Sequence, residues 1–105
     1  MEIEIQDLSA KLEQSIPLLD VRMPDEYEEG HVPGAFLIPL PELPERVGEL
    51  ADIEGELLVI CKLGGRSAKA CEFLATHGLQ VINVAGGTDA WIELGNTVVS
   101  GPEPQ

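Results

Sequence analysis

The sequence predicts a three-layer α/β/α protein with a central, mainly parallel sheet. Short apolar runs alternate along the chain with amphipathic stretches of helical spacing. The apolar runs, such as Leu-Leu-Val-Ile at 57–60, are continuous, which is typical of strands covered on both faces. A chain of 105 residues supports one hydrophobic core. We therefore expect a single domain at 1–100 and a flexible C-terminal tail at 101–105.

Five strands are expected, and each is placed by its apolar residues. The first rests on Ile3 and Ile5 alone, whereas the run at 57–60 is the strongest strand signal in the chain. Pro39 closes the third strand, because proline cannot donate to a central ladder. The expected strands lie at 3–5, 17–21, 35–38, 57–60 and 81–84.

Five helices are expected between and after the strands. Ser9 is a candidate N-cap for the first helix, and Gly30 stops the second. The third has its apolar residues on one side, the fourth ends at a His-Gly pair, and the fifth is bounded by glycines. The expected helices lie at 9–14, 24–29, 41–50, 66–76 and 88–94.

The formal net charge of -13, from 19 acidic and 6 basic residues, argues against two classes of partner. Such a surface repels nucleic-acid phosphates and anionic lipid, so we expect neither nucleic-acid binding nor membrane attachment. Residues 1–5 are acidic and alternating, unlike a signal peptide. Cys61 and Cys71 do not make a disulfide framework, so a reducing cytoplasm is the expected setting.

Cys61 follows the strongest strand and precedes an expected helix, with Gly64 and Gly65 in the loop between. Ligands of parallel sheets bind beyond the carboxyl ends of the strands. Glycines allow successive N–H groups to form an anion-binding nest, and the helix N-terminus adds positive potential. A thiol at this position is expected to be held as the thiolate.

The basic residues support a reactive rather than an inert Cys61. Three of the six, Lys62, Arg66 and Lys69, lie beside it, which suits a thiolate that attacks an anionic substrate. The alternative is that Cys61 is a small apolar residue that ends a strand.

The segment Cys61-Lys62-Leu63-Gly64-Gly65-Arg66-Ser67 resembles the active loop of the rhodanese family of single-domain sulfurtransferases. Two more segments are similar to family signatures, in the family's order. The segment upstream of Cys61 contains Leu18-Leu19-Asp20-Val21-Arg22, Glu26-Tyr27 and residues 30–35. The segment downstream contains Gly86-Gly87, Ala90-Trp91 and Gly95. The resemblance covers about residues 17–95 and implies a rhodanese-like fold.

The resemblance implies a persulfide mechanism without metal or organic cofactor. Cys61 would take sulfur from an anionic donor such as thiosulfate and pass it to a thiol, to cyanide, or to a sulfur-accepting protein. The backbone of residues 62–67 would hold the persulfide, with Lys62 and Arg66 as polar contacts for the donor. Leu63 departs from the small polar residues common in relatives, which puts the preference for thiosulfate in doubt.

Three residues expected near the loop could either assist the active site or serve only the stability of the fold. Asp20 and Arg22 would either fix the active loop or form a structural ion pair, with Glu26 as another partner for Arg22; we favour the structural role. His31 as a general base is less favoured than a structural turn.

Residues of the last helices are expected to be structural. Cys71 is expected in the core rather than as a resolving thiol, and Trp91 is expected to pack on the sheet. His77 is expected to cap a helix end.

Two other functions remain open from the sequence. A cysteine phosphatase or arsenate reductase also uses a thiolate in an anion-binding loop, but its signature needs a longer segment than the four residues between Cys61 and Arg66. A non-catalytic interaction module is the second alternative, and the retained cysteine, glycines and arginine argue against it.

Overall fold

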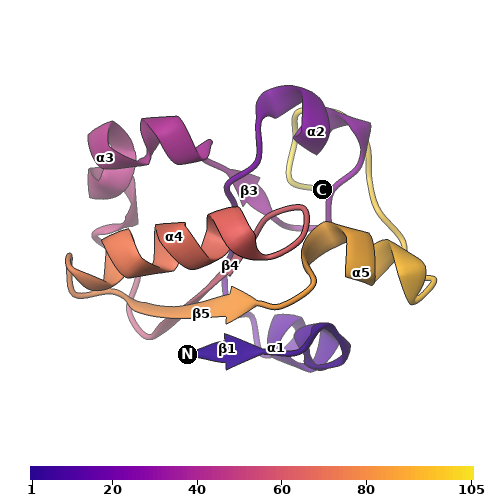
Figure 1. Cartoon of the computed structure of the whole chain (residues 1–105), viewed down its shortest axis with the longest axis horizontal. Coiled ribbons are helices and arrows are strands. Elements are labelled where there is room, and N and C mark those ends of the chain that lie inside the picture. The colour runs from indigo at the N-terminus through magenta and orange to yellow at the C-terminus, as the bar shows by residue number, and fades with distance from the viewer.

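The five strands form one sheet in the order β1-β5-β4-β2-β3, and every pairing is parallel (Figure 1). This computed structural model describes all residues from Met1 to Gln105. The strands are β1 (Glu2–Ile3), β2 (Leu18–Asp20), β3 (Phe36–Leu37), β4 (Glu56–Ile60) and β5 (Gln80–Val84). The predicted α/β class with a parallel sheet is confirmed.

Five α-helices connect and follow the strands, and three short 3-10 turns accompany them. The helices are α1 (Leu8–Glu13), α2 (Pro24–Glu29), α3 (Leu43–Arg46), α4 (Gly65–Ala75) and α5 (Gly87–Glu93). The expected continuous helix at 41–50 was wrong, because α3 lies between 3-10 turns at Leu40–Glu42 and Val47–Leu50. Pro44 lacks the amide hydrogen that a continuous helix beginning at Pro41 would donate to the Leu40 carbonyl.

The N-terminal segment also differs from expectation. Ile5 does not extend the first strand; it begins a 3-10 turn, Ile5–Asp7, and packs against the core from there. α1 continues directly from this turn, with Asp7 in the cap position. Ser9 is therefore not the N-cap but an exposed residue in the first turn of the helix.

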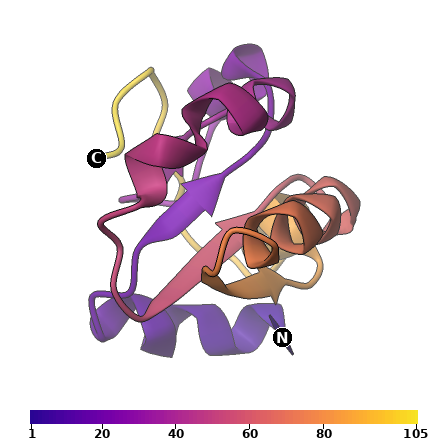
Figure 2. The same cartoon turned by 90° about the vertical axis from the view of Figure 1, so that its left-hand side faces the viewer.

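Side chains of β4 alternate between two buried clusters, one on each face of the sheet. Leu58 and Ile60 pack with Leu8 of α1 and Trp91 of α5. On the other face, Leu57, Val59 and Cys61 pack with residues of the α3 region and α4, including Leu43 and Leu74. Figure 2 shows α1 and α4 on different sides of β4. This is the three-layer arrangement predicted from the apolar pattern.

The C-terminal segment returns to the region of α2 (Figure 1). Val99 pairs with His31 in an antiparallel bridge, and the Gly101 N–H donates to the Glu28 carbonyl at 2.8 Å. The flexibility expected of residues 101–105 stays a prediction. None of the helices has the length and apolar character needed to cross a membrane.

The fold brings the carboxyl ends of β2, β4 and β5 to one edge of the sheet, because these strands are parallel neighbours. Arg22, Cys61 and Gly86 follow those ends within two residues. Segments far apart in sequence thus meet at the place where ligands of parallel sheets bind.

Candidate active site

Cys61 directly follows β4 and points toward the face covered by α4, where the residue is 1% exposed. Its Sγ accepts a hydrogen bond from the Gly64 N–H at 3.0 Å. Gly64 has a φ of +113°, which lets the chain turn back over the sulfur and start α4. The loop therefore wraps the thiol instead of exposing it.

Ser67, in the first turn of α4, forms the second polar contact of the sulfur. Its Oγ lies 3.3 Å from Cys61 Sγ and 3.2 Å from the Gly64 carbonyl. It lies closer to Oδ1 of Asn83 on β5, at 2.5 Å. A hydroxyl has one hydrogen to donate, so Ser67 serves one of these acceptors at a time.

The thiol pKa reflects two opposed effects. Burial alone would raise the pKa of Cys61, but the Ser67 hydroxyl and the backbone N–H groups of Ser67, Gly64 and Leu63 more than offset it. The net result is a pKa below the ordinary thiol value, so the thiolate is stabilised by hydrogen bonds.

The start of α5 holds the backbone of the loop from the other side. The Thr88 N–H and hydroxyl both donate to the Cys61 carbonyl, at 2.9 and 3.1 Å, and the Asp89 N–H donates to the Lys62 carbonyl at 3.1 Å. This approach needs glycine at position 87, where φ is +62° and a Cβ would lie 2.5 Å from both carbonyl oxygens.

Arg66 forms a bidentate ion pair with Glu26 of α2. Its two terminal nitrogens donate to the two carboxylate oxygens, at 2.7 and 2.9 Å. Glu26 also accepts the Met23 N–H at 2.9 Å, which caps α2 and fixes the carboxylate. The Arg66 hydrogen bond, together with the Met23 N–H, lowers the pKa of Glu26 to about 2 against its burial, so the pair is fully charged at neutral pH.

Asp20 and Arg22 form a buried ion pair at the end of β2. The Arg22 Nη2 donates to Asp20 at 2.8 Å and to the Gly30 carbonyl at 2.9 Å, while its Nε donates to the same carboxylate. The structural pairing favoured from the sequence is therefore present. A partnership of Arg22 with Glu26 was wrong, since Glu26 is held by Arg66.

The loop residues predicted to contact substrate thus divide into two groups. Gly64 and Ser67 lie against the sulfur, whereas Lys62, Leu63 and Gly65 are exposed at the mouth of the loop. Leu63 is 67% exposed, which gives the mouth an apolar side chain as expected. Arg66 lies at this mouth with Glu26 across from it.

His31 and Cys71 take structural positions. His31 is buried, stacks on the Tyr27 ring at 3.7 Å and donates from Nδ1 to the Tyr27 carbonyl at 2.8 Å, as the preferred structural interpretation expected. Cys71 packs half-buried beside the α4 core, and burial raises the pKa of its thiol to about 11. At that pKa the Cys71 thiol is protonated at neutral pH and is a poor nucleophile.

His77 and Trp91 also lie where the sequence placed them. His77 Nδ1 lies 3.2 Å from the Phe73 carbonyl at the end of α4. Trp91 packs in the core on the α1/α5 face and donates from its indole to the Thr97 carbonyl at 2.9 Å.

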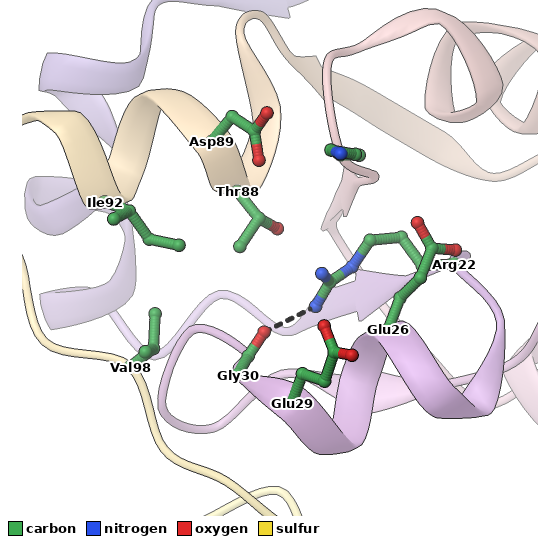
Figure 3. A pocket seen from close by; sticks show the side chains of 9 residues that line it. Arg22, Glu26, Glu29, Gly30, Thr88, Asp89, Ile92 and Val98 are labelled. Carbon is green, nitrogen blue, oxygen red and sulfur yellow. Dashed lines mark hydrogen bonds between the residues drawn. The ribbon is translucent and has the colours of Figure 1, made fainter.

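A pocket of about 270 Å³ lies beside the active loop, between α2 and α5 (Figure 3). Its polar wall contains Arg22, Glu29, Lys62, Thr88 and Asp89, and Ile92 and Val98 form an apolar side. Cys61 itself does not line it, but the pocket borders the loop through Lys62 and through Thr88, which bonds the Cys61 carbonyl.

The sequence argument missed one residue of the site, Asn83, and one pairing, that of Glu26 with Arg66. Asn83 interrupts the apolar strand β5, and a polar residue in a buried strand requires a partner, so it carried a readable signal. Its Nδ2 donates to the Gly64 carbonyl at 3.3 Å. Glu26 was noticed, but its pairing across 40 positions with Arg66 has no sequence signal.

Comparison with known proteins gives concordant results. Residues 4–94 match the family described as "Rhodanese-like domain". The chain is 37% identical to "Putative sulfurtransferase YtwF" of Bacillus subtilis, over 86% of this chain and 88% of the relative. It is 39% identical to "Thiosulfate sulfurtransferase PspE" of Escherichia coli, over 66% of this chain and 67% of the relative.

Solved structures show the same fold. A crystal structure of a rhodanese-related protein from Thermoplasma volcanium superposes with a TM-score of 0.88 at 38% identity. The superposition covers 95% of this chain and 98% of that one.

Proposed function

The chain belongs to the rhodanese-like domain family, and from that membership we propose that it is a sulfurtransferase that carries sulfane sulfur as a persulfide on Cys61. The observation that carries the proposal is the pair of hydrogen bonds to Cys61 Sγ, from Gly64 N–H at 3.0 Å and from Ser67 Oγ at 3.3 Å. These bonds lower the thiol pKa against the effect of burial, as a nucleophilic thiolate requires.

The first half-reaction loads the sulfur. The Cys61 thiolate attacks the outer sulfur of thiosulfate, a new S–S bond forms, and the old S–S bond breaks with its electron pair leaving on sulfite. The product persulfide is an anion, and we propose that backbone N–H groups of residues 62–67 hold it; those of Leu63, Gly64 and Ser67 already stabilise the thiolate. Relatives named as sulfurtransferases, one of them for thiosulfate, support this donor class.

Lys62 and Arg66 are the cations at the mouth that would meet an anionic donor. Lys62 is exposed and makes no ion pair, while two of the five N–H donors of Arg66 are engaged by Glu26. Leu63 offers an apolar contact beside them. We propose that Asp20 and Arg22 support the site by fixing the end of β2 next to β4.

The second half-reaction discharges the persulfide. An acceptor thiolate or cyanide attacks the outer sulfur, the bond to Cys61 Sγ breaks, and its electron pair restores the thiolate. No other oxidant or reductant is needed, because sulfane sulfur only changes carrier. A sulfur-accepting protein could replace the small acceptor. We place the reaction in a reducing cytoplasm, where both cysteines remain free as they are here.

The experiment is mass spectrometry of the intact protein after incubation with thiosulfate. We expect one added sulfur atom on the wild type, none on Cys61→Ser, and loss of the added atom on treatment with cyanide. The matched control is Cys71→Ser, which should still load. Absence of the adduct with thiosulfate, polysulfide and mercaptopyruvate would favour a non-catalytic interaction module.

A parallel assay addresses the phosphatase and arsenate reductase alternative. Hydrolysis of a chromogenic phosphate ester or reduction of arsenate should be absent, since the four residues from Lys62 to Gly65 make a tight loop. Turnover of either substrate that depends on Cys61 would overturn the assignment.

A further inference from the structure

We propose that the pocket between α2 and α5 binds the α-amino-acid end of a small thiol that accepts sulfur from Cys61. This inference rests on the proposed sulfurtransferase function and adds the class of acceptor and the residues that select it. The pocket, drawn in Figure 3, borders the active loop through Lys62 and Thr88.

A buried cation with an unused donor provides the anion-binding part of the pocket. Arg22 is 5% exposed, and its Nε and Nη2 are bonded to Asp20 and Gly30. Its Nη1 makes no hydrogen bond, although Arg22 lines the pocket, and in Figure 3 the guanidinium lies between Gly30 and Thr88. A buried guanidinium with a free N–H edge is a binding site for a carboxylate. Asp20 neutralises the charge of Arg22, so the exposed Lys62 ammonium on the same pocket supplies the unpaired positive charge.

Two unpaired carboxylates provide the cation-binding part. Glu29 of α2 and Asp89 of α5 line the pocket from opposite helices, and neither forms an ion pair. Glu26, the third acidic residue of the lining, is already neutralised by Arg66. Glu29 and Asp89 are therefore the groups available to a ligand ammonium.

A ligand with both charges matches this lining better than a simple anion. An α-amino acid presents a carboxylate for Arg22 and Lys62 and an ammonium for Glu29 and Asp89. The apolar side of the pocket, from Ile92 and Val98, suits a short methylene chain. Cysteine and γ-glutamyl thiols carry this end group, whereas thiosulfate and cyanide do not.

The chemical step is the discharge already described, with the acceptor defined. The acceptor thiolate attacks the outer sulfur of the Cys61 persulfide, the S–S bond to Sγ breaks, and the acceptor leaves as its own persulfide. The Cys61 thiolate is regenerated, so atoms and electrons balance without a further reagent.

The test measures discharge of preloaded protein by four thiols that differ in charge: cysteine, cysteamine, 3-mercaptopropionate and 2-mercaptoethanol. Loading of Cys61 is first quantified by mass spectrometry, and rates are compared between variants for the same thiol, so intrinsic thiol reactivity cancels. Glu29→Gln and Asp89→Asn should each slow discharge by cysteine and cysteamine relative to 2-mercaptoethanol, by about fivefold when combined. Glu28→Gln and Glu93→Gln, exposed residues on the same two helices outside the pocket, should leave the ratio unchanged.

The outcomes separate this inference from the proposed function. If Cys61 does not load, the sulfurtransferase proposal fails. If Cys61 loads, and the ratio of the discharge rate with cysteine to that with 2-mercaptoethanol is the same in the wild type and both pocket variants, the proposed acceptor pocket is wrong. The proposal is also overturned if the pocket variants are discharged faster by 3-mercaptopropionate, equally slower by cysteamine and at an unchanged rate by cysteine. That pattern would reflect a long-range effect of net charge and not binding in the pocket. If the double variant does not fold, Glu29→Gln and Asp89→Asn are tested separately, and each is expected to reduce the relative discharge rates by less than the double variant would.

Discussion

Arg66 and Glu26, 40 positions apart, form a bidentate ion pair at the mouth of the Cys61 loop. The sequence placed three cations beside the cysteine, but the fold sets a carboxylate against one of them. The mouth is therefore less positive than the local sequence indicates. An anionic donor that uses the bidentate edge of Arg66 has to compete with Glu26 for it.

Replacing Glu26 by Gln should strengthen binding of a dianionic donor. The variant removes the competing charge and keeps an amide oxygen for the Met23 N–H. We expect the KM for thiosulfate to fall by about threefold to tenfold, with a smaller effect at high ionic strength. Steady-state sulfur transfer to cyanide measures this, with Glu28→Gln as the control. A higher KM in the variant would show that Glu26 positions Arg66 for the donor instead.

The same substitution should change how stability depends on pH. The pKa of Glu26 is about 2 in the folded protein, below its ordinary value of 4.5, so its stabilising contribution is present above that ordinary value. The contribution is lost as the pH falls from about 4.5 toward 2. Because both side chains are partly exposed, we expect it to be about 1 kcal/mol at neutral pH. Urea unfolding of wild type and Glu26→Gln should differ at neutral pH and converge in acid; a constant difference would contradict this account.

Removing the Ser67 hydroxyl should raise the pKa of the Cys61 thiol. Ser67 is the largest favourable contributor that offsets the burial of the sulfur, so Ser67→Ala leaves more of the burial effect unopposed. We expect the pH profile of iodoacetamide alkylation to move to higher pH, with a rate at neutral pH lower by about threefold to tenfold. Ser9→Ala, at an exposed position on α1 without a side-chain hydrogen bond, is the matched control. An unshifted profile would mean that Ser67 gives its hydrogen to Asn83 in both protonation states.

A side chain at position 87 should damage both the fold and the loop. In Gly87→Ala the new Cβ would lie 2.5 Å from the Cys61 and Lys62 carbonyl oxygens, at a φ of +62°. We expect a loss of about 2–4 kcal/mol in the free energy of unfolding. Gly95→Ala is the control, because its φ is +86° but no atom lies within 4 Å of the added Cβ. That variant should lose only about 1 kcal/mol.

Chemical denaturation and persulfide loading measure the effect at position 87. Equal losses of stability for Gly87→Ala and Gly95→Ala would show that α5 and the loop move apart to accept the Cβ at position 87 with no further loss in the free energy of unfolding. Loss of loading only in Gly87→Ala would show that the contact also shapes the loop around Cys61.

Local sequence predicted most of the elements and the candidate nucleophile. The continuous apolar run before Cys61 predicted a buried strand, and Gly64 and Gly65 predicted a loop whose backbone N–H groups turn toward the cysteine. These are properties of neighbouring residues, so they are readable without the fold. The same holds for the resemblance of the Cys61 loop to the rhodanese family.

Prolines and competing turns limited the prediction of boundaries. Pro44 interrupts a segment with helical spacing, and the prediction missed this because the spacing of apolar residues carries no information about a missing amide hydrogen. Near the N-terminus, Ile5 reached the core from a 3-10 turn, so one apolar residue satisfied burial without extending the strand.

Tertiary structure alone decided which charges meet at the site. Parallel strand order places the ends of β2, β4 and β5 at one edge, and α2 and α5 then stand on either side of the loop. Only this arrangement assigns Glu26 to Arg66, and Glu29 and Asp89 to a pocket beside Lys62. The physical reason is that ion pairs depend on distances of a few ångströms between side chains, whereas sequence fixes only the local conformation of each segment. The sequence by itself thus predicted Cys61 as the candidate nucleophile, and the fold determined the charges that surround it.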